Sequence, residues 1–380
     1  MSFNAPTTPH ISAGHTYVKP QARSWTCEGA SCEAAAFQST LPGFEPTPLV
    51  EIPALAVELN VGRVFIKDES KRWALGAFKV LGASWAVFNE VARLTGYTGE
   101  KSFAGLHKWV CEQPPVVLVT ATDGNHGRAV ARLARLLGLT ARVFVPEIVP
   151  EKPIARIRAE GAEITVVKGS YDDSVCAAIA ATGSDPRASL VQDTSWEGYE
   201  QVPFWTSEGY STLFGEVDSQ LESAGAASVS LIGVPVGVGS LAHAAVIHYR
   251  SQTLTPPPSI MSVEPDTAAC VLESLSDGYM HSVPTGFTIM NGLNFPTPST
   301  IAWPYLINGM DAAVAVTDTE TASAVEDLKR QGVTSGPSGA SSLAGLRTML
   351  LGDGGAERRS ALGLTSHSVA VAISTEGFTD

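Results

Sequence analysis

The chain has 380 residues, 44% of them hydrophobic and 17% charged, which is typical of a globular protein rather than a disordered or fibrous one. The formal net charge is −13 and no basic run is present, so we expect no nucleic acid as a partner. No apolar run could span a membrane, and five scattered cysteines without a CxxC pair predict neither disulfides nor a zinc ribbon, so we expect a cytoplasmic protein with no membrane partner.

In chain order, residues 1–37 are polar, contain Pro, Gly and Ser, and predict an N-terminal arm. Alanine-rich segments with helical spacing follow, for example at 125–139 and 321–332. They alternate with short, apolar, β-branched runs that predict strands at 63–69, 116–120, 141–146, 163–169, 189–193, 230–237, 259–265, 312–318 and 369–374. This alternation predicts parallel sheets covered on both faces, with the chemistry in the loops that follow the strands.

Lys79 stands between Phe78 and Val80, where a helix is predicted to begin. A lysine kept from water tends to lose its proton, and a neutral amine is a nucleophile. A lysine near a helix start can also lay its stem on apolar surface and keep its charge in water. Composition alone does not separate these two readings.

Two glycine-containing loops each follow a predicted strand and open a predicted helix. In the loop at 120–129, Asp123 offers a carboxylate and Asn125 an amide near a helix N-terminus that favours anions, although a helix cap with turn glycines is the alternative. In the loop at 235–245, the residues from Gly237 to Ser240 suit a cradle of backbone N–H groups around a phosphate. The second loop completes neither a dinucleotide fingerprint nor a Walker motif, and ordinary strand–helix packing competes with it.

Hydrolytic and metal chemistry are not supported by the motifs. The segment 332–342 lacks the glycine two places after Ser338 that a nucleophile elbow requires. The eight histidines form no metal-binding spacing, so we expect no metal, and His126 is interpreted as a packed, hydrogen-bonded side chain.

A lysine among apolar neighbours, two glycine-containing loops suited to anions and the AISTEG segment near the C-terminus together predict a cofactor with an aldehyde and a phosphate, held as a Schiff base. Five segments resemble the fold-type II pyridoxal phosphate enzymes of the tryptophan synthase β and threonine dehydratase group. They are KDES (67–70), AFK (77–79), DGNHG (123–127), GVGS (237–240) and IST (373–375). Further segments resemble the diaminopropionate ammonia-lyase family, namely ATDGNHGR (121–128), QDTSWEGY (192–199), GLNFPTPS (292–299), SGPSGA (335–340) and ISTEG (373–377).

The resemblance implies an α/β fold of the tryptophan synthase β type with pyridoxal 5′-phosphate in an interdomain cleft. Residues 38–85 and 205–380 would form the large cofactor-binding domain, and 86–204 the small domain. The family resemblance also implies a homodimer.

The resemblance implies roles for individual residues. Lys79 would carry the cofactor and act as an acid–base group, Asp123 would be the second base, and Asp193 would meet the substrate's β-ammonium. The residues that would bind the cofactor are Lys79, Phe78, Asn125, Gly237, Val238, Gly239, Ser240, Ser374 and Thr375. The substrate pocket would contain Asp123, Asp193, Asn294, Phe295 and Ser338. Whether Ser374 or Thr375 faces the pyridine nitrogen stays open.

The implied reaction is β-elimination of ammonia from 2,3-diaminopropionate, or a similar β-substituted amino acid, giving pyruvate and ammonia. The chain departs from the family where Phe295-Pro296 replaces a common Cys-Gly, and where Asn291 replaces a small residue. These changes alter the expected pocket, so two alternatives remain. One is a serine/threonine dehydratase or β-replacement enzyme, and the other is a catalytically inactive cofactor-binding protein.

Overall fold

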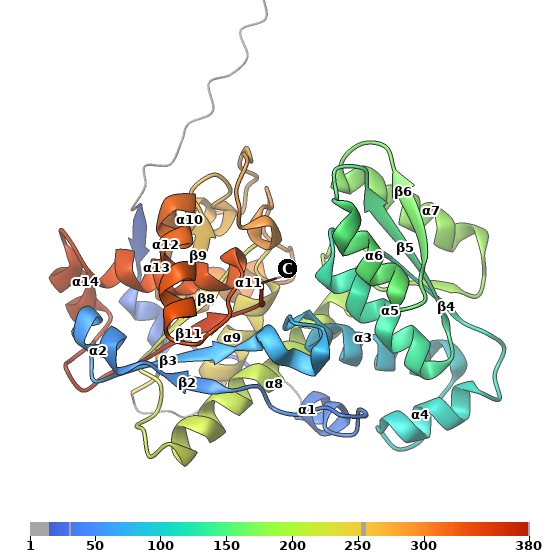
Figure 1. Ribbon diagram of the computed structural model, residues 1–380, viewed down its shortest axis with the longest axis horizontal. Helices are drawn as coiled ribbons and strands as arrows, with labels where there is room; N and C mark the ends of the chain where they lie inside the picture. Colours follow the sequence, from blue (N-terminus) through green and yellow to red (C-terminus); the bar gives the residue numbers. More distant parts are fainter. Residues whose placement is uncertain (1–14, 30–31, 252–255, 379–380) are drawn as a thin grey trace, which may run out of the picture. The chain divides into compact units, whose positions relative to one another are not determined.

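The computed structural model describes residues 15–29, 32–251 and 256–378 (Figure 1). Within it the chain divides into two compact units. The first unit takes its described residues from 1–28, 48–68 and 218–380, and the second from 29–47 and 69–217. The domain boundaries expected from the sequence, at 85/86 and 204/205, and the interdomain cleft stay predictions.

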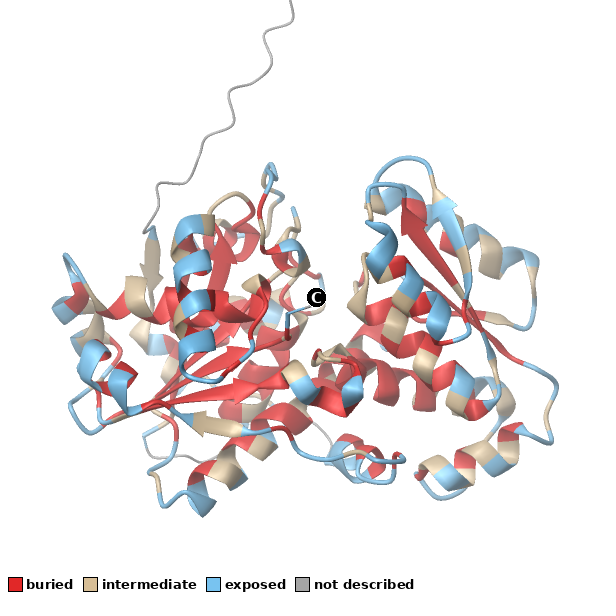
Figure 2. Ribbon diagram, viewed as in Figure 1, coloured by how far each residue is buried: buried red, intermediate tan, exposed pale blue. Residues whose placement is uncertain are grey.

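The first unit is built on a seven-stranded sheet. Its inner strands are parallel, and the short strands at its two edges are antiparallel to their neighbours. In spatial order the strands are β1 (Thr16–Val18), β10 (Ala312–Val316), β9 (Ser259–Pro265), β8 (Leu231–Pro235), β11 (Val369–Ser374), β3 (Arg63–Asp68) and β2 (Leu49–Glu51). The inner strands are almost wholly buried, as Figure 2 shows, because helices cover a parallel sheet on both faces.

The helices of the first unit pack against this sheet or against one another. The long helix α13 contacts four of the inner strands, β8, β9, β10 and β11. The helical segments are η1 (Pro20–Ser24), α2 (Pro53–Leu59), α9 (Ser240–Arg250), α10 (Cys270–Asp277), η3 (Asn291–Leu293), α11 (Trp303–Gly309), α12 (Asp318–Arg330), α13 (Pro337–Leu350) and α14 (Gly355–Ala361). Helix α8 (Gln201–Ser223) contains the boundary between the units.

The second unit has a four-stranded parallel sheet in the order β6 (Glu163–Val167), β5 (Thr140–Pro146), β4 (Val117–Ala121) and β7 (Ala188–Leu190). Its helix α3 packs along α5 in a core of small and branched apolar side chains. The helical segments are α1 (Glu33–Gln38), η2 (Glu69–Ala74), α3 (Lys79–Thr95), α4 (Phe103–Val110), α5 (Asn125–Leu137), α6 (Glu151–Ala159) and α7 (Tyr171–Ser184).

The α/β class and the parallel sheets predicted from the sequence are confirmed. The predicted strands at 259–265 and 369–374 coincide with β9 and β11. The edge strands β1 and β2 were not predicted, because three residues carry too little periodicity to be recognised. Strand β1 lies inside the predicted N-terminal arm, of which residues 1–14 and 30–31 fall outside the described residues. No helix in the described part of the chain is both long and apolar enough to cross a membrane.

Candidate active site

Two neighbouring strands of the second unit bring two carboxylates to one edge of the sheet. Strands β4 and β7 are paired and parallel, and Asp123 and Asp193 follow their carboxyl ends. Gln192 ties the two strand ends together, since its Oε1 accepts hydrogen bonds from Thr120 Oγ1 and the backbone N–H of Ala121, both at 3.0 Å. The carboxyl edge of a parallel sheet is where polar functional groups are expected.

Lys79, the first residue of α3, reaches this edge. Its Nζ donates a hydrogen bond of 2.6 Å to Asp193 Oδ2, with 19% of the lysine side chain and 9% of the aspartate side chain exposed. Burial lowers the pKa of Lys79, but Asp193, together with Tyr210 and Asp123, outweighs burial and raises the pKa above its ordinary value. Burial alone therefore does not set the protonation of Lys79, because the buried amine has a counter-charge.

The two carboxylates differ in their proton affinity. Burial raises the pKa of Asp123, an effect that Lys79 opposes and Asp193 reinforces. Burial also favours a higher pKa for Asp193, but the charges of His126 and Lys79 outweigh it and hold the pKa of Asp193 well below its usual range. A pair of carboxyl groups whose environments separate their pKa values is typical of acid–base sites.

His126 is buried on α5 and packed as predicted, since its Nε2 lies 2.8 Å from the carbonyl oxygen of Val191. Its Nδ1 lies 3.7 Å from Asp193 Oδ2, the same oxygen that accepts from Lys79. The sequence predicts a packed histidine at this position but gives no direct sign of this electrostatic contact. The shared loop DGNHG was the one available signal for it.

Two tyrosines that the sequence did not indicate also belong to this part of the second unit. Tyr171, at the start of α7, accepts a 2.6 Å hydrogen bond from Gln192 Nε2. Burial raises the pKa of Tyr171 well above the ordinary value, and Asp193 and Asp123 add to the effect. The ring of Tyr210 packs 4.7 Å from that of Phe78, centroid to centroid. Neither tyrosine lies in a glycine-rich loop, so local sequence carries no signal for it.

The turn that holds Asn125 is tied together by one hydroxyl. Thr122 Oγ1 accepts hydrogen bonds from the backbone N–H groups of Gly124 at 3.0 Å and Gly127 at 3.1 Å. A Cβ on Gly127 would lie 2.3 Å from Thr122 Cγ2, so a side chain is excluded there. Asn125 is the first residue of α5, where the free N–H groups of the helix favour an anionic or electron-rich ligand.

The remaining predicted residues gather in the first unit, again at neighbouring parallel strands. The glycine loop from Gly237 to Ser240 follows β8 and leads into α9, and Ser374 ends the adjacent strand β11. Gly239 has a φ of +100°, a conformation that favours glycine. Val238 lies inside this loop, and its carbonyl accepts a 2.7 Å hydrogen bond from the backbone N–H of Ser299.

Close packing surrounds this loop and strand end. A Cβ on Gly237 would lie 2.7 Å from Phe295 Cδ2, so the glycine makes room for the aromatic ring. Ser374 Oγ donates a 2.7 Å hydrogen bond to Ser335 Oγ, and both groups are buried. A Cβ on Gly339 would lie 2.8 Å from the backbone nitrogen of Thr375.

The predicted pocket residues of the first unit have partners of their own. Ser338 Oγ accepts a 3.3 Å hydrogen bond from the backbone N–H of Gly292. Asn294 Nδ2 donates a 3.0 Å hydrogen bond to the carbonyl of Gly286. The structure thus brings the predicted residues together in two sets. Lys79, Phe78, Asp123, Asn125 and Asp193 lie in the second unit, and the others lie in the first.

Both sets fit pyridoxal phosphate. In the second unit, an amine that can condense with an aldehyde lies beside two carboxylates. In the first unit, a loop with no room for a side chain at Gly237 or Gly239 precedes the N-terminus of α9, which fits a phosphate group. The buried Ser374 hydroxyl there fits a neutral ring nitrogen once its proton turns from Ser335 Oγ to that acceptor. No group of three or more His, Cys, Asp or Glu side chains among the described residues is placed to hold a metal ion.

Comparisons with known proteins agree with this chemistry. The family described as "Pyridoxal-phosphate dependent enzyme" matches residues 40–365. The diaminopropionate ammonia-lyase of Salmonella typhimurium is 37% identical over 293 residues, covering 75% of this chain and 72% of that protein. The diaminopropionate ammonia-lyase of Escherichia coli K12 is 33% identical over 356 residues, covering 91% and 88%.

A solved structure gives the same result for the fold. The crystal structure of Escherichia coli diaminopropionate ammonia-lyase in complex with D-serine superposes with a TM-score of 0.84 at 29% identity, covering 97% of this chain and 92% of that one. With so much of the chain matched, the chain belongs to the fold-type II pyridoxal phosphate-dependent enzymes, and within them to the diaminopropionate ammonia-lyase family.

Proposed function

We propose that this enzyme eliminates ammonia from 2,3-diaminopropionate, or from a similar amino acid with a β-ammonium group, and that hydrolysis of the released product by water gives pyruvate and a second ammonia. The observation that carries the proposal is the 2.6 Å contact between Lys79 Nζ and Asp193 Oδ2. Asp193 already holds an ammonium group in a largely buried position, beside a second carboxylate. The β-ammonium of a diamino acid has the same charge and hydrogen-bonding groups as that lysine head.

Each carboxylate has a separate proposed task. Asp193 keeps its charge, so it binds the β-ammonium and keeps the leaving nitrogen protonated. Asp123, whose pKa is raised by burial, removes the proton from Cα once it is ionised, and Lys79 can do so from the other face when its amine is neutral. The cofactor, when bound, supplies an electron sink for the negative charge that develops at Cα.

The first unit supplies binding groups rather than proton transfer in this proposal. The backbone N–H groups from Gly237 to Ser240 would hold the phosphate, and the lack of room for a side chain at Gly237 and Gly239 supports this role. The hydroxyl of Ser374, or its neighbour Thr375, would face the ring nitrogen, while Asn125 of the second unit would bind the phenolic oxygen. Asn294, Phe295 and Ser338 would shape the substrate pocket.

A substrate comparison tests the reaction. Purified holoenzyme is given 2,3-diaminopropionate, D-serine and L-serine, and pyruvate release is followed. We expect the fastest release from 2,3-diaminopropionate, and we expect Asp193→Asn to reduce kcat/KM for this substrate more than for serine, because a hydroxyl leaving group needs no anionic partner. Asp172→Asn, on the exposed start of α7, is the matched control. Faster turnover of serine would instead favour a dehydratase.

A spectrum tests the covalent link to the cofactor. The purified protein should absorb in the near-visible range, and Lys79→Ala should remove that band because the variant has no amine at this position. A protein that stays colourless with added pyridoxal phosphate would contradict the proposal. Homodimer formation and a cytoplasmic location also stay predictions, which size-exclusion chromatography and cell fractionation would test.

A further inference from the structure

The backbone just before Lys79 adopts an unusual conformation. Among the non-glycine residues in the described ranges, positive φ angles occur at Asn60, Trp73 and Ala74, with φ of +53°, +48° and +54°. Two of the three are therefore consecutive and lie a few residues before Lys79, and Gly76 adds a φ of +79°. An L-residue in this left-handed region costs about 1–2 kcal/mol, and such residues persist only where their surroundings enforce them.

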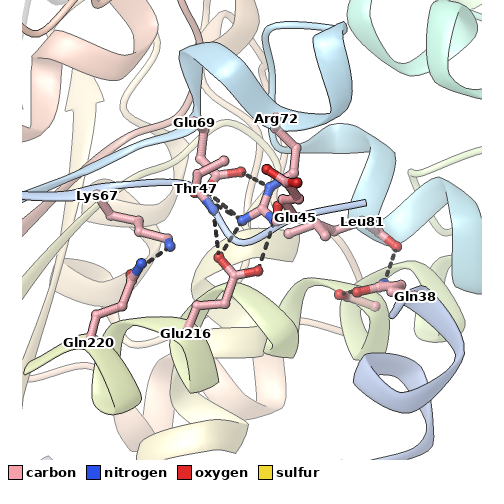
Figure 3. Close-up of polar contacts among 10 residues, drawn as sticks. Gln38, Glu45, Thr47, Lys67, Glu69, Arg72, Leu81, Glu216 and Gln220 are labelled. Carbon is pink, nitrogen blue, oxygen red and sulfur yellow. Dashed lines mark hydrogen bonds and ion pairs between the residues drawn. The ribbon is translucent and has the colours of Figure 1, made fainter. Parts of the chain in front are cut away.

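Arg72 anchors the beginning of this segment (Figure 3). Its guanidinium is fully buried and forms paired hydrogen bonds of 2.6–2.8 Å with the carboxylates of Glu69 and Glu216, and one of 3.0 Å with Thr47 Oγ1. Burial opposes the charge, but the two carboxylates raise the pKa of Arg72 above its ordinary value. Paired contacts of this planar group with two carboxylates leave its orientation little freedom.

Two further side chains hold the rest of the segment. Trp73 Nε1 donates a 2.8 Å hydrogen bond to the carbonyl of Pro42. Arg128 Nη1 donates a 3.0 Å hydrogen bond to the carbonyl of Leu75. Arg128 lies on α5, whose first residue is Asn125, so it connects the helix behind the DGNHG turn to the backbone that leads into Lys79.

We infer that residues 72–76 form a strained support that sets the position of the Lys79 amine, with Arg72 and Arg128 as its positioning residues. The inference rests on the proposed role of Lys79. Only Ala77 and Phe78 separate the segment from the lysine, so a rotation of its backbone is transmitted directly to the start of α3. Without its anchors the segment can relax toward ordinary φ values, and the lysine then loses its alignment with Asp193.

Arg128 offers a matched comparison on one helix. Arg128 and Arg135 both form ion pairs with Glu160, at 3.4 Å and 2.9 Å, but Arg128 alone of these two bonds the Leu75 carbonyl. In holoenzyme we expect Arg128→Met to lower kcat for 2,3-diaminopropionate about tenfold, while the KM of Arg128→Met and both constants of Arg135→Met stay within about twofold of the wild type. Hydrogen exchange at residues 75–79 should accelerate in Arg128→Met only. Equal behaviour of the two variants would overturn the inference.

A second comparison relieves the strain without removing an anchor. Ala74→Gly removes the side chain that disfavours the left-handed conformation, and Asn60→Gly makes the same kind of change at the C-cap of α2 in the first unit. We expect Ala74→Gly to lower kcat several-fold and speed exchange around Lys79 without lowering the unfolding temperature, since glycine tolerates both conformations. Asn60→Gly should keep the wild-type kcat. An unchanged kcat in Ala74→Gly would contradict the inference.

The spectrum of Lys79→Ala distinguishes failure of the proposed role of Lys79 from failure of the positioning role of residues 72–76. If this variant keeps the near-visible band, the proposed role of Lys79 fails, and the positioning role fails with it. If the band is lost but Arg128→Met matches Arg135→Met in kcat and exchange, only the positioning role fails. The exchange measurement does not depend on turnover, so it is informative whichever substrate proves best.

Discussion

Replacing Asp193 by asparagine tests whether its ion pair with Lys79 stabilises the protein. Opposite unit charges 2.6 Å apart attract by about 6 kcal/mol at an effective dielectric constant of about 20. Transfer of both groups from water costs several kcal/mol, which leaves a net contribution of about 2–4 kcal/mol. Asp193→Asn preserves the shape of the side chain but leaves the Lys79 cation without its main counter-charge. We expect it to lower the free energy of unfolding by about 3 kcal/mol.

A double-mutant cycle isolates this pair from other effects of the substitutions. Lys79→Met, Asp193→Asn and the double variant are compared with the wild type by urea unfolding of cofactor-free protein. His126 remains in all four proteins, so its contact with Asp193 cancels unless it depends on Lys79. We expect a coupling energy of about 2 kcal/mol or more.

The pH of the measurement follows from the directions of the pKa shifts. The pKa of Lys79 is raised, so its contribution is complete below the ordinary lysine value of about 10.4 and is lost above it. The pKa of Asp193 is lowered, so its contribution is complete above the ordinary value of about 3.9 and is lost on acidification. At pH 7 both contributions are present. A coupling energy below about 0.5 kcal/mol at this pH would refute the reasoning.

Three further predictions concern the first unit. Burial raises the pKa of Glu264 to about 8, so the native state retains a proton that the unfolded state loses. As the pH rises from about 5 to 7, the free energy of unfolding of the wild type should therefore fall by about 1.4 kcal/mol per pH unit relative to that of Glu264→Gln, as measured by urea unfolding. The same pH dependence in both proteins would contradict this prediction. Gly237→Ala should weaken pyridoxal phosphate binding, measured by fluorescence titration, because the new methyl group displaces the Phe295 ring. Adding Phe295→Ala should restore binding, and a double variant that binds no better than Gly237→Ala would contradict this prediction. Ser374→Ala should lower the free energy of unfolding by about 1 kcal/mol through loss of its hydrogen bond to Ser335, and an unchanged value would exclude that contribution.

The sequence predicted the sheets and the strand-end loops because both depend on local patterns. Continuous apolar runs mark buried parallel strands, and the loops that follow them carry Asp123 and the glycines of the proposed phosphate cradle. The family motifs added Asp193, whose local surroundings carry no distinct signal, and gave Ser374 of the AISTEG segment a specific role. The structure brings the Lys79 amine and the Asp193 carboxylate together.

Other features depend on contacts between distant segments and could not be predicted. The charge of Lys79 is retained because a residue more than a hundred positions away supplies a carboxylate, and burial alone would have predicted the opposite. The buried Arg72 forms hydrogen bonds with Thr47 and with the carboxylates of Glu69 and Glu216, which lie in three separate segments of the chain. The left-handed backbone at Trp73 and Ala74 has no sequence signature, because these residue types rarely adopt it.

Gln192 limits how this enzyme can be re-engineered. Its oxygen accepts two hydrogen bonds at the end of β4, and its nitrogen donates one to Tyr171. Glutamate would accept the same hydrogen bonds at β4 and would require the Tyr171 hydroxyl to donate instead, but it would add a negative charge next to Asp193 in the chain; leucine could make none of these contacts, so position 192 favours an amide. Libraries that seek a new substrate range should therefore keep Gln192 unchanged and vary Asn294 and Phe295, which are proposed to shape the substrate pocket.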